Sequence, residues 1–101
     1  MINPALTIPA SDLRRLCQTY QVRRLAVFGS ATTDRFTADS DVDLLVEFQP
    51  QSQAGMLTLS RMQRELADML HRPVDLVPEK GLKPRIRDEV LASSEVVYEA
   101  A

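Results

Sequence analysis

Short apolar runs alternate with amphipathic stretches along this chain, and their order limits the folds that it can adopt. Four runs have the length and composition of β-strands: 24–28, 42–48, 74–77 and, more weakly, 95–100. Three stretches place apolar residues at helical spacing: 11–20, 56–71 and 82–92. The order helix, strand, strand, helix, strand, helix, strand predicts an α/β (α+β) fold in which helices cover one mixed sheet of about four strands. No internal repeat or linker divides the chain, so residues 1–101 are expected to form a single domain.

The expected helices have apolar faces and recognisable ends. The first one gathers four residues on one face, Leu13, Leu16, Cys17 and Tyr20. Ser11 is expected to cap its N-terminus. Pro73 should end the second helix just after His71, which is interpreted as a surface or capping residue. The third helix is expected to point three residues inward, Ile86, Val90 and Leu91.

Charge and cysteine content argue against several classes of protein. The formal net charge of −2 gives no global attraction to nucleic acid or to anionic membranes. Cys17 is the only cysteine, so an internal disulfide and a cysteine-rich zinc site are excluded. The N-terminus lacks the features of a signal peptide, and no apolar run approaches the roughly 20 residues of a membrane span. The sequence therefore predicts a cytoplasmic protein with no membrane association and no direct nucleic-acid binding.

Three aspartates occupy apolar strand-like runs, where carboxylates are costly to bury. Asp41 and Asp43 should share one face of their strand because alternate side chains point the same way. Asp75 has a similar setting in 74–77, and it can reach the same spot if the two strands are neighbours. Like charges this close repel unless a cation lies between them, and Mg²⁺ prefers such oxygen ligands. The alternative is that all three are solvated residues at strand ends.

A Gly-Ser pair precedes these aspartates and directly follows the strand 24–28. Gly29 would let the backbone turn sharply and approach a ligand, and Ser30 could offer a hydroxyl and a backbone N–H to phosphate oxygens. A short helix beginning near Ala31 would add further N–H donors. Taken alone, the pair is also typical of an ordinary turn at the end of a strand.

Together, Gly29-Ser30, then Ser40-Asp41-Val42-Asp43-Leu44, and then Asp75 resemble the catalytic pattern of the DNA polymerase β-like nucleotidyltransferase superfamily. More narrowly, the chain resembles the minimal nucleotidyltransferase (MNT) branch, whose small members include the antitoxins of HEPN–MNT toxin–antitoxin pairs. The order of the expected elements matches that family over nearly the whole chain.

The resemblance implies a role for each matching residue. Asp41, Asp43 and Asp75 would be the catalytic residues and would bind Mg²⁺, with a two-metal site expected. Gly29, Ser30 and Ser40 would bind the nucleotide. ATP would be the substrate, and AMP would pass to a hydroxyl, expected to be a tyrosine, of a partner HEPN ribonuclease toxin. The protein would thereby act as an antitoxin.

The chain departs from the family pattern at one place. Members of the MNT branch usually continue Gly-Ser-x-Ala-Arg-Gly, whereas Thr33 and Asp34 occupy the Arg and Gly positions here. A cation is lost and an anion is added near the expected polyphosphate, although Arg35 could compensate. The alternative function is therefore a catalytically weak or inactive antitoxin of MNT fold, which neutralises its toxin by binding.

A basic stretch, 80–87, carries four positive charges and follows Asp75 closely. It could steer a nucleotide or an acidic partner toward the site. It is equally typical of a solvated loop and helix start.

Overall fold

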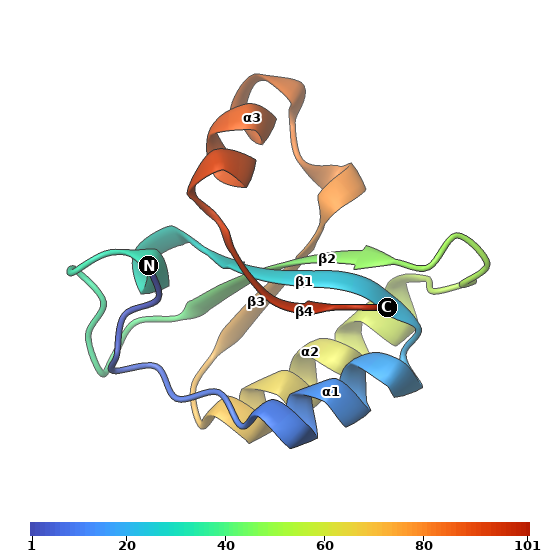
Figure 1. The fold of residues 1–101 in the computed structure, drawn as a ribbon, viewed down its shortest axis with the longest axis horizontal. Helices are drawn as coiled ribbons and strands as arrows, with labels where there is room; N and C mark the ends of the chain where they lie inside the picture. The colour runs from blue at the N-terminus through green and yellow to red at the C-terminus, as the bar shows by residue number, and fades with distance from the viewer.

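The computed structural model describes residues 1–101, which form three α-helices, two short 3-10 helices and four strands (Figure 1). In chain order these are α1 (Ala10–Thr19), β1 (Val22–Phe28), η1 (Gly29–Thr32), β2 (Val42–Phe48), α2 (Met56–Leu70), β3 (Val74–Pro78), η2 (Glu79–Gly81), α3 (Pro84–Ser93) and β4 (Glu95–Glu99). The predicted element order is confirmed. None of the helices is long and apolar enough to cross a membrane.

All four strands belong to one sheet with the order β3-β2-β1-β4. β1 pairs antiparallel with both β2 and β4, whereas β2 and β3 are parallel. The parallel pair is joined through α2, because a chain that returns to run in the same direction needs a crossover connection. The predicted mixed sheet of four strands is therefore confirmed.

The hydrophobic core lies between one face of the sheet and the two helices α1 and α2, which lie side by side beneath it (Figure 1). Alternate residues of β1 and β2, such as Leu25 and Leu44, point into this layer and meet Met62 and Leu66 of α2. Cys17 of α1 is also completely buried there, and burial raises the pKa of its thiol to about 12. The predicted packing role of this cysteine is consistent with its position.

α3 stands on the opposite side of the sheet from α1 and α2 (Figure 1). Of the three residues predicted to point inward, Ile86 does not, because it is 39% exposed. Val90 and Leu91 are half-buried and lie outside the hydrophobic core. The core layer is already filled by α1 and α2. The second face of the sheet is consequently covered only in part, and it carries polar and charged side chains.

Two expected helix starts also differ from the structure. α1 begins one residue before Ser11, and Pro9 occupies the N-cap position without a side-chain cap, so the predicted cap is wrong. Its carbonyl accepts the first helical hydrogen bond from Leu13 N. The helix expected near Ala31 is only the four-residue η1, so it supplies no extended row of aligned peptide dipoles. His71 does end α2, in a left-handed conformation with φ 57°.

Candidate functional site

The sequence-predicted aspartates and the Gly-Ser pair meet at one end of the sheet. This end is formed by the end of β1 and the beginnings of β2 and β3. Asp43 is paired with Phe28 on one side, the residue before Gly29, and with Asp75 on the other. Neighbouring strands lie about 4.8 Å apart, so Asp43 and Asp75 stand next to each other on the same face. Asp41 is exposed just before β2.

Gly29 is the point at which the backbone and the Asp43 side chain come closest. Its φ of +73° lies in the left-handed region, which side-chain-bearing residues rarely adopt. A Cβ at this position would collide with Asp43 Oδ2 and would lie 3.2 Å from Asp43 Cγ. The absence of a side chain therefore allows both the turn into η1 and the position of the Asp43 carboxylate.

The pKa of Asp43 is shifted by burial and by the two neighbouring aspartates. Partial burial raises the pKa of its carboxyl group above the usual value, and the charges of Asp75 and Asp41 raise this pKa further. Each of the two other aspartates is thus close enough to disfavour a negative charge on Asp43. The three carboxylates form one electrostatic unit at the end of the sheet.

The chemistry of this unit suits a hard divalent cation. No group of three or more His, Cys, Asp or Glu side chains is already gathered as a metal centre. The donor set is nevertheless three carboxylates, the ligands that Mg²⁺ prefers. A cation would relieve the repulsion from Asp75 and Asp41, which adds to the effect of burial on the Asp43 pKa. On donor type and charge, Asp41, Asp43 and Asp75 fit a magnesium ion.

Thr33 and Asp34, which depart from the family pattern, lie in a hydrogen-bonded turn directly after η1. The Thr33 hydroxyl donates to Ser30 O at 2.8 Å and accepts a hydrogen bond from Arg35 N at 3.2 Å. The Thr32 hydroxyl donates to Gly29 O at 2.8 Å. The threonines therefore stabilise the turn that follows the Gly-Ser pair, in place of a long cationic side chain.

A polar groove of about 570 Å³ lies against this turn. It is lined by Gly29, Ser30, Thr32, Thr33, Arg35, Glu89 and Ser93, and Asp34 is absent from its lining. Arg35 therefore borders the same space as the Gly-Ser pair, as its predicted compensating role requires. Glu89 and Ser93 come from α3 and were missed by sequence reasoning, because nothing in their spacing indicates that α3 stands over η1.

Ser40 lies in the loop before β2 and stabilises a turn there. Its hydroxyl accepts a hydrogen bond from Thr37 N at 3.0 Å. Arg72 Nη1 donates to both Ser40 O and Thr37 O at 3.1 Å, and the guanidinium lies 4.4 Å from the centre of the Phe36 ring. Arg72, which the sequence did not single out, thus fixes the loop that delivers Asp41 and Asp43 to the sheet.

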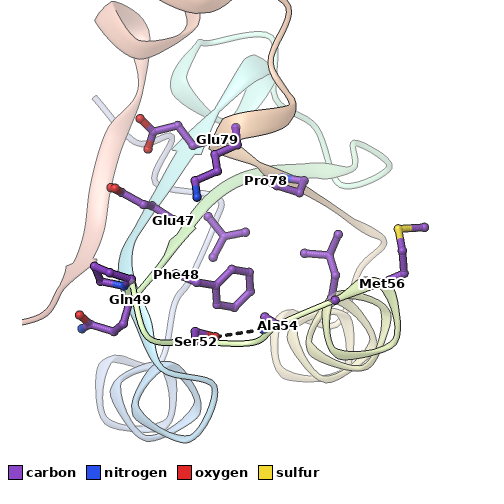
Figure 2. A pocket seen from close by; sticks show the side chains of 13 residues that line it. Glu47, Phe48, Gln49, Ser52, Ala54, Met56, Pro78 and Glu79 are labelled. Carbon is purple, nitrogen blue, oxygen red and sulfur yellow. Dashed lines mark hydrogen bonds between the residues drawn. The ribbon is translucent and has the colours of Figure 1, made fainter.

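A second cavity, of about 350 Å³, lies at the other end of β2 (Figure 2). Its wall includes Glu47, Phe48 and Pro78 from the ends of the parallel strands, and Met56 from the start of α2. None of the three aspartates lines this cavity, and neither does the Gly-Ser pair. The aspartates do not line the polar groove either, but Gly29 and Ser30 do, and Gly29 lies against the Asp43 side chain. The second cavity has no such connection to the predicted site residues.

Comparison with known proteins agrees with the pattern of residues. A family model described as "Nucleotidyltransferase domain" matches residues 12–97. The chain is 36% identical over 97 residues to protein adenylyltransferase MntA of Thermococcus cleftensis, a match that covers 96% of this chain and 91% of that protein.

Two solved toxin–antitoxin structures share the fold. One is a toxin–antitoxin crystal structure with AMP-PNP, which superposes with a TM-score of 0.74 at 17% identity and covers 92% of this chain and 75% of the other. The other is a tri-AMPylated HEPN toxin of Shewanella oneidensis in complex with an MNT antitoxin, with a TM-score of 0.65 at 16% identity and coverage of 90% and 70%. At these identities the likeness establishes the fold alone.

The positive φ of Gly29 and its contact with Asp43 can be tested by substitution. Replacing Gly29 with Ala should lower the free energy of unfolding by about 1–3 kcal/mol, because the new Cβ is strained at positive φ and collides with Asp43. Denaturant unfolding measures this change. The matched control is Gly81→Ala, where the nearest atom to a new Cβ is 4.0 Å away and the effect should stay within about 0.5 kcal/mol. Equal effects at both positions would contradict the special role of Gly29.

The raised pKa of Asp43 generates a pH-dependent prediction for the metal-free protein. Because folding raises this pKa, ionisation of Asp43 opposes folding; the penalty is absent below the unfolded value of about 3.9 and develops as the pH rises through the folded value. Asp43→Asn should therefore raise Tm at pH 7 and leave it unchanged at pH 3. Excess Mg²⁺ should raise the Tm of the unaltered protein only.

Asp68→Asn is the control for this measurement, because Asp68 is exposed on α2. It should change neither the Tm at pH 7 nor the response to Mg²⁺. A lower Tm for the Asp43→Asn protein at pH 7 without metal would contradict the electrostatic interpretation of the site.

Proposed function

The chain belongs to the nucleotidyltransferase domain family, and we propose that it transfers AMP from ATP, with Mg²⁺, to a tyrosine hydroxyl of a HEPN ribonuclease toxin. In this proposal the protein is an antitoxin. The observation that carries it is the in-register pairing of Asp43 with Asp75 beside Gly29, with Asp41 close enough to act on the same carboxylate.

The relatives support the choice of reaction and partner. The Thermococcus cleftensis protein is named a protein adenylyltransferase, and the match to it extends over almost the whole of both chains. The structures that share the fold include one with an ATP analogue and one in which the HEPN toxin itself carries AMP. A nucleotide and a HEPN toxin are therefore the substrates proposed for this chain.

Asp41, Asp43 and Asp75 would hold the magnesium. When bound, the metal supplies positive charge that neutralises the three carboxylates and the phosphate oxygens. The remaining interactions come from the chain. Gly29 lets the backbone approach the triphosphate, and Ser30 donates hydrogen bonds to its oxygens. The Ser40 hydroxyl accepts a hydrogen bond from Thr37 N and lies 3.2 Å from the Thr37 hydroxyl, and it would turn its hydrogen from Thr37 toward a phosphate oxygen.

The transfer forms one bond and breaks one. The tyrosine oxygen attacks the α-phosphorus of ATP, the bond between the α-phosphorus and the bridging oxygen to the β-phosphate breaks, and pyrophosphate leaves. Asp75 is exposed at the edge strand β3, where it can accept the proton of the incoming hydroxyl. Positioning and charge neutralisation supply most of the rate enhancement in such reactions.

A second candidate function is neutralisation by binding alone. It is favoured by the missing cation at Thr33, whose hydroxyl is used inside the turn, and by Glu89 on the wall of the groove. Both features weaken attraction for a polyphosphate. The carboxylates remain in place, so the first candidate is preferred.

Transfer of label from α-³²P-ATP tests these alternatives. The protein is incubated with Mg²⁺, labelled ATP and a candidate HEPN-type partner protein. We expect the label on the toxin, and we expect Asp41→Ala and Asp43→Ala to reduce transfer by at least about a hundredfold, because each removes a ligand and its charge. Toxin binding without transfer would support the binding antitoxin instead. Asp68→Ala is the control and should retain transfer.

Arg35 generates a separate prediction about nucleotide affinity. Arg35→Ala should weaken ATP binding about 10–100-fold, the loss expected for one charge-assisted hydrogen bond to a phosphate. Glu89→Gln should tighten binding, because it removes a carboxylate from the same groove. Isothermal titration with Mg-ATP measures both changes. Arg85→Ala removes an exposed cation outside the groove and is the control; an equal loss there would indicate an effect of net charge only.

A further inference from the structure

Glu79 is the one charged residue that the fold buries, with 8% of its surface exposed. It lies in η2, between β3 and α3. Buried carboxylates are rare unless they are paired, so its surroundings need an explanation.

Two arginines from different elements pair with Glu79. Arg24 Nη2 of β1 lies 3.2 Å from Glu79 Oε2, and Arg87 Nη2 of α3 lies 3.3 Å from Glu79 Oε1. Arg87 Nη1 also donates to Glu79 O at 3.4 Å. One carboxylate therefore joins a central strand of the sheet to the outer helix.

This link is the main polar attachment of α3. The side-chain hydrogen bonds that leave α3 all come from Arg87, whereas Ser93 and Ser94 bond to carbonyls of their own segment. No residue of α3 is completely buried, and its apolar Val90 and Leu91 are half-buried. Glu79 is therefore the polar link between this helix and the sheet.

The same helix forms one wall of the polar groove. Glu89 and Ser93 of α3 face the space that Gly29, Ser30 and Arg35 border from the other side. A displacement of α3 would change the width of this groove and the separation of Glu89 from Arg35.

We propose that Glu79 is a positioning residue for the nucleotide groove, because it bridges Arg24 and Arg87 and thereby holds α3 over η1. The inference rests on the proposed function in one respect, namely that the ligand of the groove is the triphosphate of ATP. Loss of the Glu79 charge would leave Arg87 without its ion-pair partner and Arg24 paired with Glu47 alone, so the connection between β1 and α3 would be cut.

Glu47 provides the matched control. It lies 3.4 Å from Arg24 Nη2 and 3.0 Å from Arg23 Nη1, so it belongs to the same charged cluster. It makes no bond to α3. Substitution of Glu47 therefore perturbs the cluster and Arg24 without cutting the connection to the helix.

The experiment measures α3 and ATP binding separately in full-length protein. Hydrogen exchange is followed in residues 84–93 without nucleotide, and the Kd of Mg-ATP is measured by titration. Glu79→Gln should speed exchange in 84–93 by at least about tenfold, beyond any change in β1 and β2, and should raise the Kd about five- to tenfold. Glu47→Gln should change neither quantity more than about twofold.

Arg87→Ala covers the case in which Glu79→Gln does not fold. The Arg87 side chain is 42% exposed, and its removal leaves Glu79 paired with Arg24, so no unpaired charge is buried. It should loosen α3 and raise the Kd in the same direction. Arg87→Lys keeps a charge within reach of Glu79 and should restore part of both effects, which a general loss of stability would not do.

The outcomes separate the inference from the proposed function. Unchanged exchange in 84–93 of both the Glu79→Gln and Arg87→Ala proteins overturns the anchoring role. Faster exchange with an unchanged Kd overturns the connection between α3 and the groove. Absence of Mg-ATP binding by the unaltered protein overturns the proposed function and the nucleotide role of Glu79 together, while the exchange data still report on the anchor.

Discussion

The parallel pairing of β2 with β3 is the constraint on which the site depends. Its register places Asp43 directly beside Asp75, so two carboxylates must share one face at the spacing of neighbouring strands. The sheet does not allow them to move apart, because the same two strands bury Val42, Leu44 and Leu76 on the other face. Apolar burial on one face thus holds like charges together on the opposite face.

The two faces of the sheet consequently differ in composition: one is apolar and the other carries the charged and polar side chains. The face covered by α1 and α2 contains nearly all of the hydrophobic core, and Cys17 is the only titratable residue among its fully buried members. The other face carries the aspartates, the polar groove and the charged cluster around Glu79. α3 contributes no completely buried residue and is tied to β1 through the ion pairs of Glu79, so the polar groove lies next to the helix that the core stabilises least.

The strands and the positions of their aspartates could be predicted from the sequence, because each depends only on a short apolar run. The apolar runs at β2 and β3 each have an aspartate as their second residue, so once the two strands are known to be parallel neighbours in this register, Asp43 lies beside Asp75. Ser11 is not the cap because α1 already begins at Ala10, and the carbonyl of Pro9 accepts the first helical hydrogen bond from Leu13 N. The roles of Arg72, Glu79 and Glu89 were beyond local patterns: each depends on contacts with distant segments or on the placement of α3.

The departure at Thr33 and Asp34 has a different meaning once the turn is seen in three dimensions. Thr33 forms hydrogen bonds with Ser30 O and Arg35 N, so the residue that replaces the family's arginine also shapes the backbone leading to Arg35. Asp34, the added anion, lies outside the lining of the groove, whereas Arg35 is part of it. The loss of a cation at one position is thus accompanied by a cation two residues later that faces the same space. Asp41, Asp43 and Asp75 are not altered by this exchange. The departure therefore bears on how tightly the proposed triphosphate would be held, and it leaves the groups proposed for the chemical step unchanged.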